Sequence, residues 1–353
     1  MEFLIEYGLF LAQTVTIVIA IIVVIGSIVS ASSKGRSNEE GHIEVTHLNE
    51  RFDKIKEAVQ EQILSKAELK ALAKEEKKAH KEAEKKEKAA LKAKKKGNVA
   101  DDQDEKGRVF VVDFDGDMHA HQVDMLREEI SAILSVADKK DEVVVRLESP
   151  GGVVHGYGLA ASQLMRVRER EIPLIVAVDM VAASGGYMMA CVANKIIAAP
   201  FAIVGSIGVL AQLPNFNRLL KKHDIDYEQF TAGEFKRTVT VFGENTDKAR
   251  QKFQEELEET HVLFKSFVSG NRPSLDISKV ATGEHWYGKQ AVDLNLIDEI
   301  TTSDDYLLEL SEERDIYKVE YLVKKSLGEK IGLSFAMAWQ SALAKISKSL
   351  ATR

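Results

Sequence analysis

The feature that most constrains the fold is a change of pattern near residue 107, where short β-branched runs begin to alternate with segments of helical periodicity. Strands are predicted at residues 108–114, 142–147, 173–181, 195–199 and 319–323. Helices are predicted at residues 121–136, 156–168, 216–223 and 248–268. Such alternation is typical of right-handed βαβ crossovers on a mostly parallel sheet. Residues 107–353 are therefore expected to form an α/β domain built from βαβ units.

An apolar segment lies at the N-terminus. Residues 7–33 carry no charge, and residues 9–29 are long enough for a helix across about 30 Å of hydrocarbon. A single-pass transmembrane anchor within residues 1–33 is therefore predicted. A cleavable signal peptide is the alternative, but its leader should be positive, whereas this one holds two glutamates and no basic residue. Basic residues follow the run and none precede it, which favours a cytoplasmic domain, although nearby glutamates weaken that inference.

The segment between the anchor and the α/β domain, residues 34–106, is dominated by Lys, Glu and Ala. It has no aromatic residue or proline between Asp53 and Val109 and cannot build a core, so a charged helical stalk or linker is expected. Its lysines at 92 and 94–96 are interpreted as part of a solvated spacer, with contact to anionic lipid headgroups as the alternative.

Composition excludes several classes of protein. The chain has 48 Lys and Arg against 55 Asp and Glu, a net charge of −7, so no overall positive field points to nucleic acid. The single cysteine, Cys191, excludes an internal disulfide framework and argues against a cysteine-based metal site. No metal and no cofactor are expected.

Two turns rich in small residues follow successive predicted strands. One is Glu148-Ser149-Pro150-Gly151-Gly152, and the other is Ala182-Ala183-Ser184-Gly185-Gly186-Tyr187. Ligands bind at the carboxyl ends of strands in open α/β sheets. A serine between a strand and a helix can expose its hydroxyl, and the N–H groups of Gly151, Gly152 and Gly185 could stabilise an oxyanion. Each turn alone is also compatible with simple close packing.

A nucleophilic serine needs a base. His155 follows the first turn and could approach the site, although a histidine in a loop is usually a surface residue. A lysine is the alternative, provided that burial or a neighbouring cation keeps its amine neutral.

These motifs, followed by Val204-Gly205-Ser206-Ile207-Gly208-Val209 and Trp286-Tyr287-Gly288-Lys289-Gln290-Ala291, resemble those of the signal peptide peptidase A family. The N-terminal anchor and charged extension are most similar to its SohB branch. The resemblance spans residues 107–299. It implies the fold of the Clp protease and crotonase superfamily, a superhelix of βαβ units. One departure is Asn295, which stands where the family usually has glycine and which a left-handed helix end tolerates.

The resemblance also implies a membrane-anchored serine endopeptidase with a Ser/Lys dyad. Its nucleophile falls on Ser184, its general base on Lys236 within Gly233-Glu234-Phe235-Lys236, and the serine that orients the lysine on Ser206. In relatives with one repeat, serine and lysine come from neighbouring protomers, so a homo-oligomeric ring is implied. The implied substrates are signal-peptide remnants or unfolded membrane and exported proteins, and the implied location is the inner membrane. Relatives with known topology expose the catalytic part outside the cytoplasm, whereas the charges that flank the apolar run favour the cytoplasm. No side of the membrane is therefore assigned to the catalytic domain.

Two other functions share these features. A crotonase-type acyl-CoA enzyme would have the same fold and a backbone oxyanion site, but it would not need Ser184 or Lys236. A non-catalytic membrane scaffold could keep the ring and use the site only to hold peptides.

Overall fold

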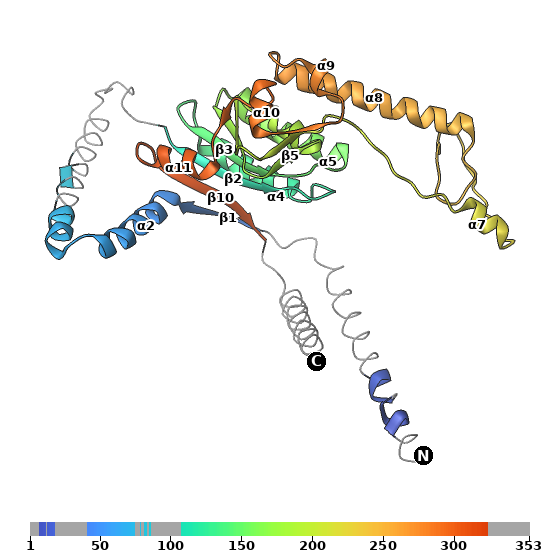
Figure 1. The fold of residues 1–353 in the computed structure, drawn as a ribbon, viewed down its shortest axis with the longest axis horizontal. Helices are drawn as coiled ribbons and strands as arrows, with labels where there is room; N and C mark the ends of the chain where they lie inside the picture. Colours follow the sequence, from blue (N-terminus) through green and yellow to red (C-terminus); the bar gives the residue numbers. More distant parts are fainter. Residues whose placement is uncertain are drawn as a thin grey trace. The chain divides into compact units, whose positions relative to one another are not determined.

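A computed structural model of the chain describes residues 7–11, 13–17, 41–74, 78, 81–82, 85 and 107–323 (Figure 1). The chain divides into two compact units, one of Ile43–Glu320 and one that joins Met1–His42 with Tyr321–Arg353. Among the described residues, no helix combines the length and apolar character that a membrane crossing requires. Most of the predicted anchor at residues 9–29, and the stalk lysines at 92 and 94–96, lie outside the described residues.

A seven-stranded sheet forms the centre of the larger unit, and its order is β1-β10-β2-β3-β4-β6-β9. Every strand pair from β10 to β9 is parallel, as the alternation of strands and helices predicted. The strands are β1 (His42–His47), β2 (Val109–Asp115), β3 (Glu142–Glu148), β4 (Leu174–Val178), β6 (Lys195–Ala198), β9 (Glu299–Ile300) and β10 (Ile316–Leu322). The mixed α/β fold expected from the sequence is confirmed.

Helices cover both faces of this sheet because side chains alternate along each strand. In β2, Phe110, Val112 and Phe114 join the larger core, whereas Val109 and Val111 join a second core. The larger core contains residues of α4 (Val123–Val136), α5 (Val154–Glu169), α6 (Gly185–Ala190) and α8 (Asp247–Asn271). The second core contains residues of α2 (Leu48–Ile63) and α11 (Ser303–Ser311). Strands buried on both faces explain the nearly continuous apolar runs in the sequence.

A second, three-stranded sheet has the order β5-β7-β8. Its strands are β5 (Val181–Ala183), β7 (Ile203–Gly205) and β8 (His285–Tyr287). The run 173–181, predicted as one strand, is therefore two strands in different sheets. The chain turns between them at Asp179, whose carboxylate accepts the backbone N–H of Ser303 at 2.8 Å. Because β4/β5 and β6/β7 each place one strand in either sheet, the chain winds between the two sheets.

Other elements differ little from the predictions. Short helices α9 (Ile277–Val280) and α10 (Gly288–Asp293) follow α8, and Asn295 beyond α10 has a left-handed φ of 59°, as expected for the residue that replaces glycine there. Within the segment predicted as a stalk, β1 joins the large sheet and Leu48 at the start of α2 is buried.

One part of the larger unit projects from its body. Residues 209–246 form an arm that runs outward from β7, carries α7 (Asn217–Lys222), and returns to the start of α8 (Figure 1). Asn215 and Asn217 join its two legs: their side-chain amides donate to the carbonyls of Thr240, Gly243 and Phe242 at 2.9–3.0 Å.

Candidate active site

Ser184 occupies the turn between β5 and α6 in an unusual backbone conformation, with φ 53° and ψ −117°. A side chain rarely adopts this region, and such strain is typical of functional sites. The surroundings hold it there, because the N–H of Ser184 donates to the Gly205 carbonyl at 2.8 Å and its own carbonyl accepts the Met188 N–H at 2.9 Å. The serine is half-buried, so its hydroxyl can reach a bound molecule.

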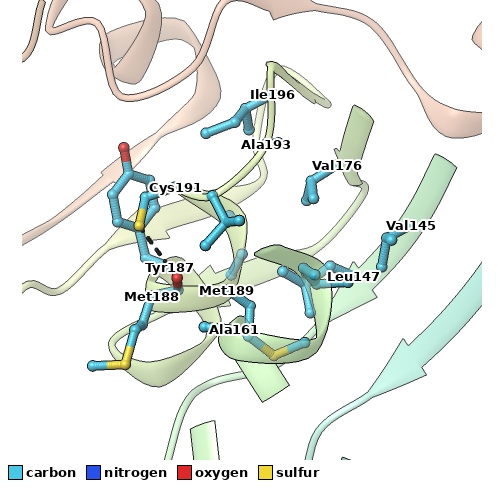
Figure 2. Close-up of a cluster of buried hydrophobic side chains, with 14 of the residues drawn as sticks. Val145, Leu147, Ala161, Val176, Tyr187, Met188, Met189, Cys191, Ala193 and Ile196 are labelled. Atoms are coloured by element: carbon cyan, nitrogen blue, oxygen red, sulfur yellow. Dashed lines mark hydrogen bonds between the residues drawn. The ribbon is translucent and has the colours of Figure 1, made fainter. Parts of the chain in front are cut away.

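The helix after Ser184 is a rigid base for this turn. All six residues of α6 are buried, and Tyr187, Met188 and Met189 belong to the same buried cluster as Val145 and Leu147 of β3 (Figure 2). Cys191, next in the chain, is fully buried and donates its Sγ–H to the Met188 carbonyl at 3.2 Å. This burial raises the pKa of the Cys191 thiol to about 12, so it is a packing residue, as its apolar neighbours predicted.

The two predicted turns meet. A Cβ placed on Gly151 would lie 2.7 Å from the Ser184 Cβ and 2.7 Å from the Gly185 nitrogen, and Gly151 has a φ of +87°. A Cβ on Gly152 would lie 2.1 Å from the Met118 carbonyl oxygen. Only glycine fits at these positions, and the result is that backbone of the first turn lies against the serine of the second.

The N–H groups of these turns have different partners. Gly151 donates its N–H to Ser149 Oγ at 3.1 Å. Within the described part of the chain, no acceptor is recorded for the N–H groups of Gly152 and Gly185. Of these two donors, Gly152 is partly exposed beside Ser184, and Gly185 is buried directly after it.

A buried pair of hydroxyls beneath the turns was not singled out from the sequence. Ser149 and Tyr157 are both fully buried, with 2.5 Å between Ser149 Oγ and Tyr157 Oη. The backbone of Ser149 also holds β5, since its N–H donates to the Val181 carbonyl and its carbonyl accepts the Ala183 N–H. In the sequence Tyr157 looks like any apolar helix position. The only feature of the sequence that could have indicated its role is a hydroxyl-bearing side chain one turn after the start of α5.

Ser206 lies beside Ser184. Strands β5 and β7 are parallel with Ala183 opposite Gly205, so each serine is the first residue beyond its strand. Ser206 also has a positive φ of 53°, and its N–H donates to the Glu284 carbonyl at 2.7 Å. The structure thus brings together Ser184, Ser206 and the glycines of both turns.

Lys236 does not join this group in the single chain. It lies in the arm between α7 and α8 and its side chain is exposed. Its neighbours face α8: Glu234 forms an ion pair with Lys248, and the Lys248 ammonium lies 5.6 Å from the centre of the Phe235 ring. No hydrogen bond to Ser184 Oγ is recorded from any residue in the described ranges. His155, the alternative base, is exposed at the start of α5.

Comparison with known proteins identifies the family. The sequence matches Peptidase family S49 N-terminal over residues 2–164 and Peptidase family S49 over residues 166–317. The "Probable protease SohB" of Haemophilus influenzae is 56% identical over 331 residues, which are 94% of this chain and 92% of the relative. The "Probable protease SohB" of Buchnera aphidicola from Acyrthosiphon pisum is 57% identical over 241 residues, 68% and 72% of the two chains.

Among solved structures, the membrane-bound stomatin-specific protease 1510-N aligns with 58% of this chain and 84% of its own, at 16% identity and a TM-score of 0.36. The sequence relatives, rather than this alignment, determine the assignment. The resemblance inferred from the sequence motifs is confirmed: the chain is a SohB-like member of peptidase family S49.

Proposed function

We infer that this chain is a serine endopeptidase whose nucleophile is Ser184 and whose general base is Lys236 of a neighbouring copy. The observation that supports the nucleophile most directly is the strained turn that presents Ser184 beside two N–H groups without acceptors in the described part of the chain. Family membership supports peptide-bond hydrolysis.

The proposed reaction has two stages. Lys236 Nζ removes the Ser184 proton as Oγ attacks the carbonyl carbon of a peptide, and backbone N–H groups of the glycine turns stabilise the resulting oxyanion. The intermediate collapses, the C–N bond breaks, and the amine leaves with the proton from Lys236. The Lys236 amine then deprotonates a water molecule, which attacks the acyl ester and releases the acid and Ser184. Ser206 would hold the lysine amine in place.

The exposed arm supports a second copy as the source of the lysine. The arm also carries apolar side chains that are largely exposed, including Phe230 at 90% and Leu210 at 78%. Six more apolar residues of the arm are exposed to a smaller extent: Leu213, Phe216, Leu219, Ile225, Tyr227 and Phe242. A monomer rarely leaves so much apolar surface in contact with water. A homo-oligomeric ring would cover the arm and bring Lys236 to the Ser184 of its neighbour.

The proposed substrates are apolar peptides such as signal-peptide remnants and unfolded membrane or exported proteins. Met118 supports this preference, because its side chain is 64% exposed and its backbone touches the proposed oxyanion turn. Anchoring in the inner membrane through residues 9–29 remains part of the proposal.

A serine-directed fluorophosphonate probe tests the dyad. Labelling of the full-length protein should disappear in Ser184→Ala and Lys236→Ala and persist in Lys222→Ala, which removes another exposed lysine of the arm. The labelling rate should rise toward alkaline pH, because only a neutral amine accepts a proton. Labelling that ignores both substitutions would contradict the proposal and leave the acyl-CoA enzyme or the non-catalytic scaffold.

A further inference from the structure

The carbonyl of Asp117, which can only accept, sets the direction of every hydrogen bond beneath the two turns. Tyr157 Oη lies 2.8 Å from the carbonyl oxygen of Asp117, and a carbonyl only accepts, so the phenol proton points there. Tyr157 Oη must then accept from Ser149 Oγ, 2.5 Å away. With its own proton used in this way, Ser149 Oγ is left to accept the N–H of Gly151. The order is Gly151 to Ser149 to Tyr157 to Asp117.

Burial keeps this chain of hydrogen bonds in one state. Ser149 and Tyr157 are both 0% exposed, and burial raises the pKa of the Tyr157 phenol, so the phenol retains its proton. A buried hydroxyl deprived of its partner would carry the full desolvation penalty, so the arrangement is strongly favoured over any other.

Packing places the same tyrosine under both turns. A Cβ on Gly185 would lie 2.4 Å from Tyr157 Cγ, so the ring lies directly against the residue after the nucleophile. A Cβ on Gly116 would lie 2.5 Å from Ser149 Oγ and 2.5 Å from Tyr157 Oη, so nothing larger than glycine fits beside the hydroxyl pair. One side chain thus supports the first turn through its hydroxyl and the second through its ring.

We propose that Ser149 and Tyr157 are positioning residues for the oxyanion site. By drawing the Gly151 N–H inward, they orient the following peptide so that the Gly152 N–H, together with that of Gly185, faces the substrate carbonyl. Gly151 acts as the pivot of the turn, and its own N–H is occupied. Oxyanion donors are effective only when they are fixed where charge develops. This inference rests on the proposed peptidase function.

The test is Tyr157→Phe in the full-length protein, which removes the hydroxyl and keeps the ring against Gly185. The kcat for peptide hydrolysis and the fluorophosphonate labelling rate should fall roughly 10- to 100-fold, because the donor is displaced rather than deleted. KM should stay unchanged, because the lost interaction belongs to the transition state. The matched control is Tyr187→Phe: Tyr187 is also fully buried and donates to the Leu296 carbonyl at 2.8 Å.

Tyr157→Phe loses two buried hydrogen bonds and Tyr187→Phe loses one, so Tm should fall in both variants and further in Tyr157→Phe, but only Tyr157→Phe should lose kcat. Ser149→Ala, which breaks the same chain of hydrogen bonds, gives a second variant if one folds poorly. The double variant Ser149→Ala/Tyr157→Phe should be no slower than the slower single variant, because both act through one turn.

Three outcomes overturn the inference. One is a Tyr157→Phe enzyme with the same rate as Tyr187→Phe, and another is additive losses in the double variant. The third is wild-type protein with no Ser184-dependent labelling, in which case the proposed function fails as well. Because the first two require an active wild-type enzyme, failure of the positioning role is distinguishable from failure of the peptidase.

Discussion

The backbone strain at Ser184 gives a prediction about stability that does not depend on catalysis. Ser184→Gly should be more stable than Ser184→Ala. Both variants lack the hydroxyl, so the comparison isolates the Cβ in a conformation with φ 53° and ψ −117°. A side chain in a sparsely populated region costs about 1–3 kcal/mol, and glycine avoids this cost.

Glycine also has a disadvantage, because a more flexible unfolded chain lowers stability by about 0.4–1 kcal/mol. The net expectation is that Ser184→Gly exceeds Ser184→Ala by about 0.5–2 kcal/mol in the free energy of unfolding. The control is Ser135, an exposed residue of α4 with ordinary helical geometry. There glycine should be less stable than alanine by about 1 kcal/mol, so the sign reverses between the two sites.

Urea unfolding of the four full-length variants, followed by circular dichroism, measures both differences. The two members of each pair should share one m-value, so that midpoints convert directly to free energies. If Ser184→Gly were less stable than Ser184→Ala by the same amount as at Ser135, the strain argument would be wrong. The turn would then have to relax without a Cβ penalty.

Three further predictions follow from the same region. Gly151 has a φ of +87° and no room for a Cβ, so Gly151→Ala should destabilise the protein by about 2 kcal/mol or more and abolish labelling. At Gly158 a Cβ meets nothing within 4 Å, so Gly158→Ala should stabilise α5 by about 0.5–1 kcal/mol. Thermal unfolding measures both changes, and equal effects would refute the packing argument. Burial raises the pKa of the Cys191 thiol from 9.0 to about 12, so the stability that the protonated thiol contributes is complete below pH 9.0 and is lost as the pH rises toward 12. Cys191→Ala should therefore reduce the loss of stability at alkaline pH. Iodoacetamide should not label Cys191 in the native protein at pH 8, and labelling would contradict its burial. An equal mixture of Ser184→Ala and Lys236→Ala chains should regain about a quarter of wild-type activity per site when the two are co-assembled. In a random ring, about a quarter of the sites combine an intact serine with an intact lysine from the neighbour. No recovery of activity would indicate that the serine and lysine of a site come from one protomer.

The sequence predicted the parallel sheet and both glycine turns because these depend on local patterns. Strand periodicity around Val144 and Val176, and glycines directly after strands, are properties of a few consecutive residues. The division of 173–181 into two strands could not be predicted in this way, because residues on either side of Asp179 are equally apolar. At the break, Asp179 accepts the backbone N–H of Ser303, which is distant in the sequence.

The candidate site was predictable to the same extent. The sequence placed Ser184 between a strand and a helix but did not predict its strained φ and ψ, and its register with Ser206 follows from the parallel pairing of β5 with β7. The role inferred for Tyr157 could not be read from the sequence, because it depends on where one hydroxyl lies relative to Ser149. In the proposed oligomer, the position of Lys236 relative to the serine would be set by the contact between two copies, and no pattern within one chain encodes that contact.

The arm that carries Lys236 away from the body of the molecule has a consequence for when proteolysis begins. If the base is Lys236 of a neighbouring copy, as proposed, a newly made chain would hold Ser184 in place but lack that base, so it could not cut proteins nearby while it is alone. Specific activity should then depend steeply on local concentration. The enzyme would have a threshold instead of a pro-segment, and dilution alone would switch it off.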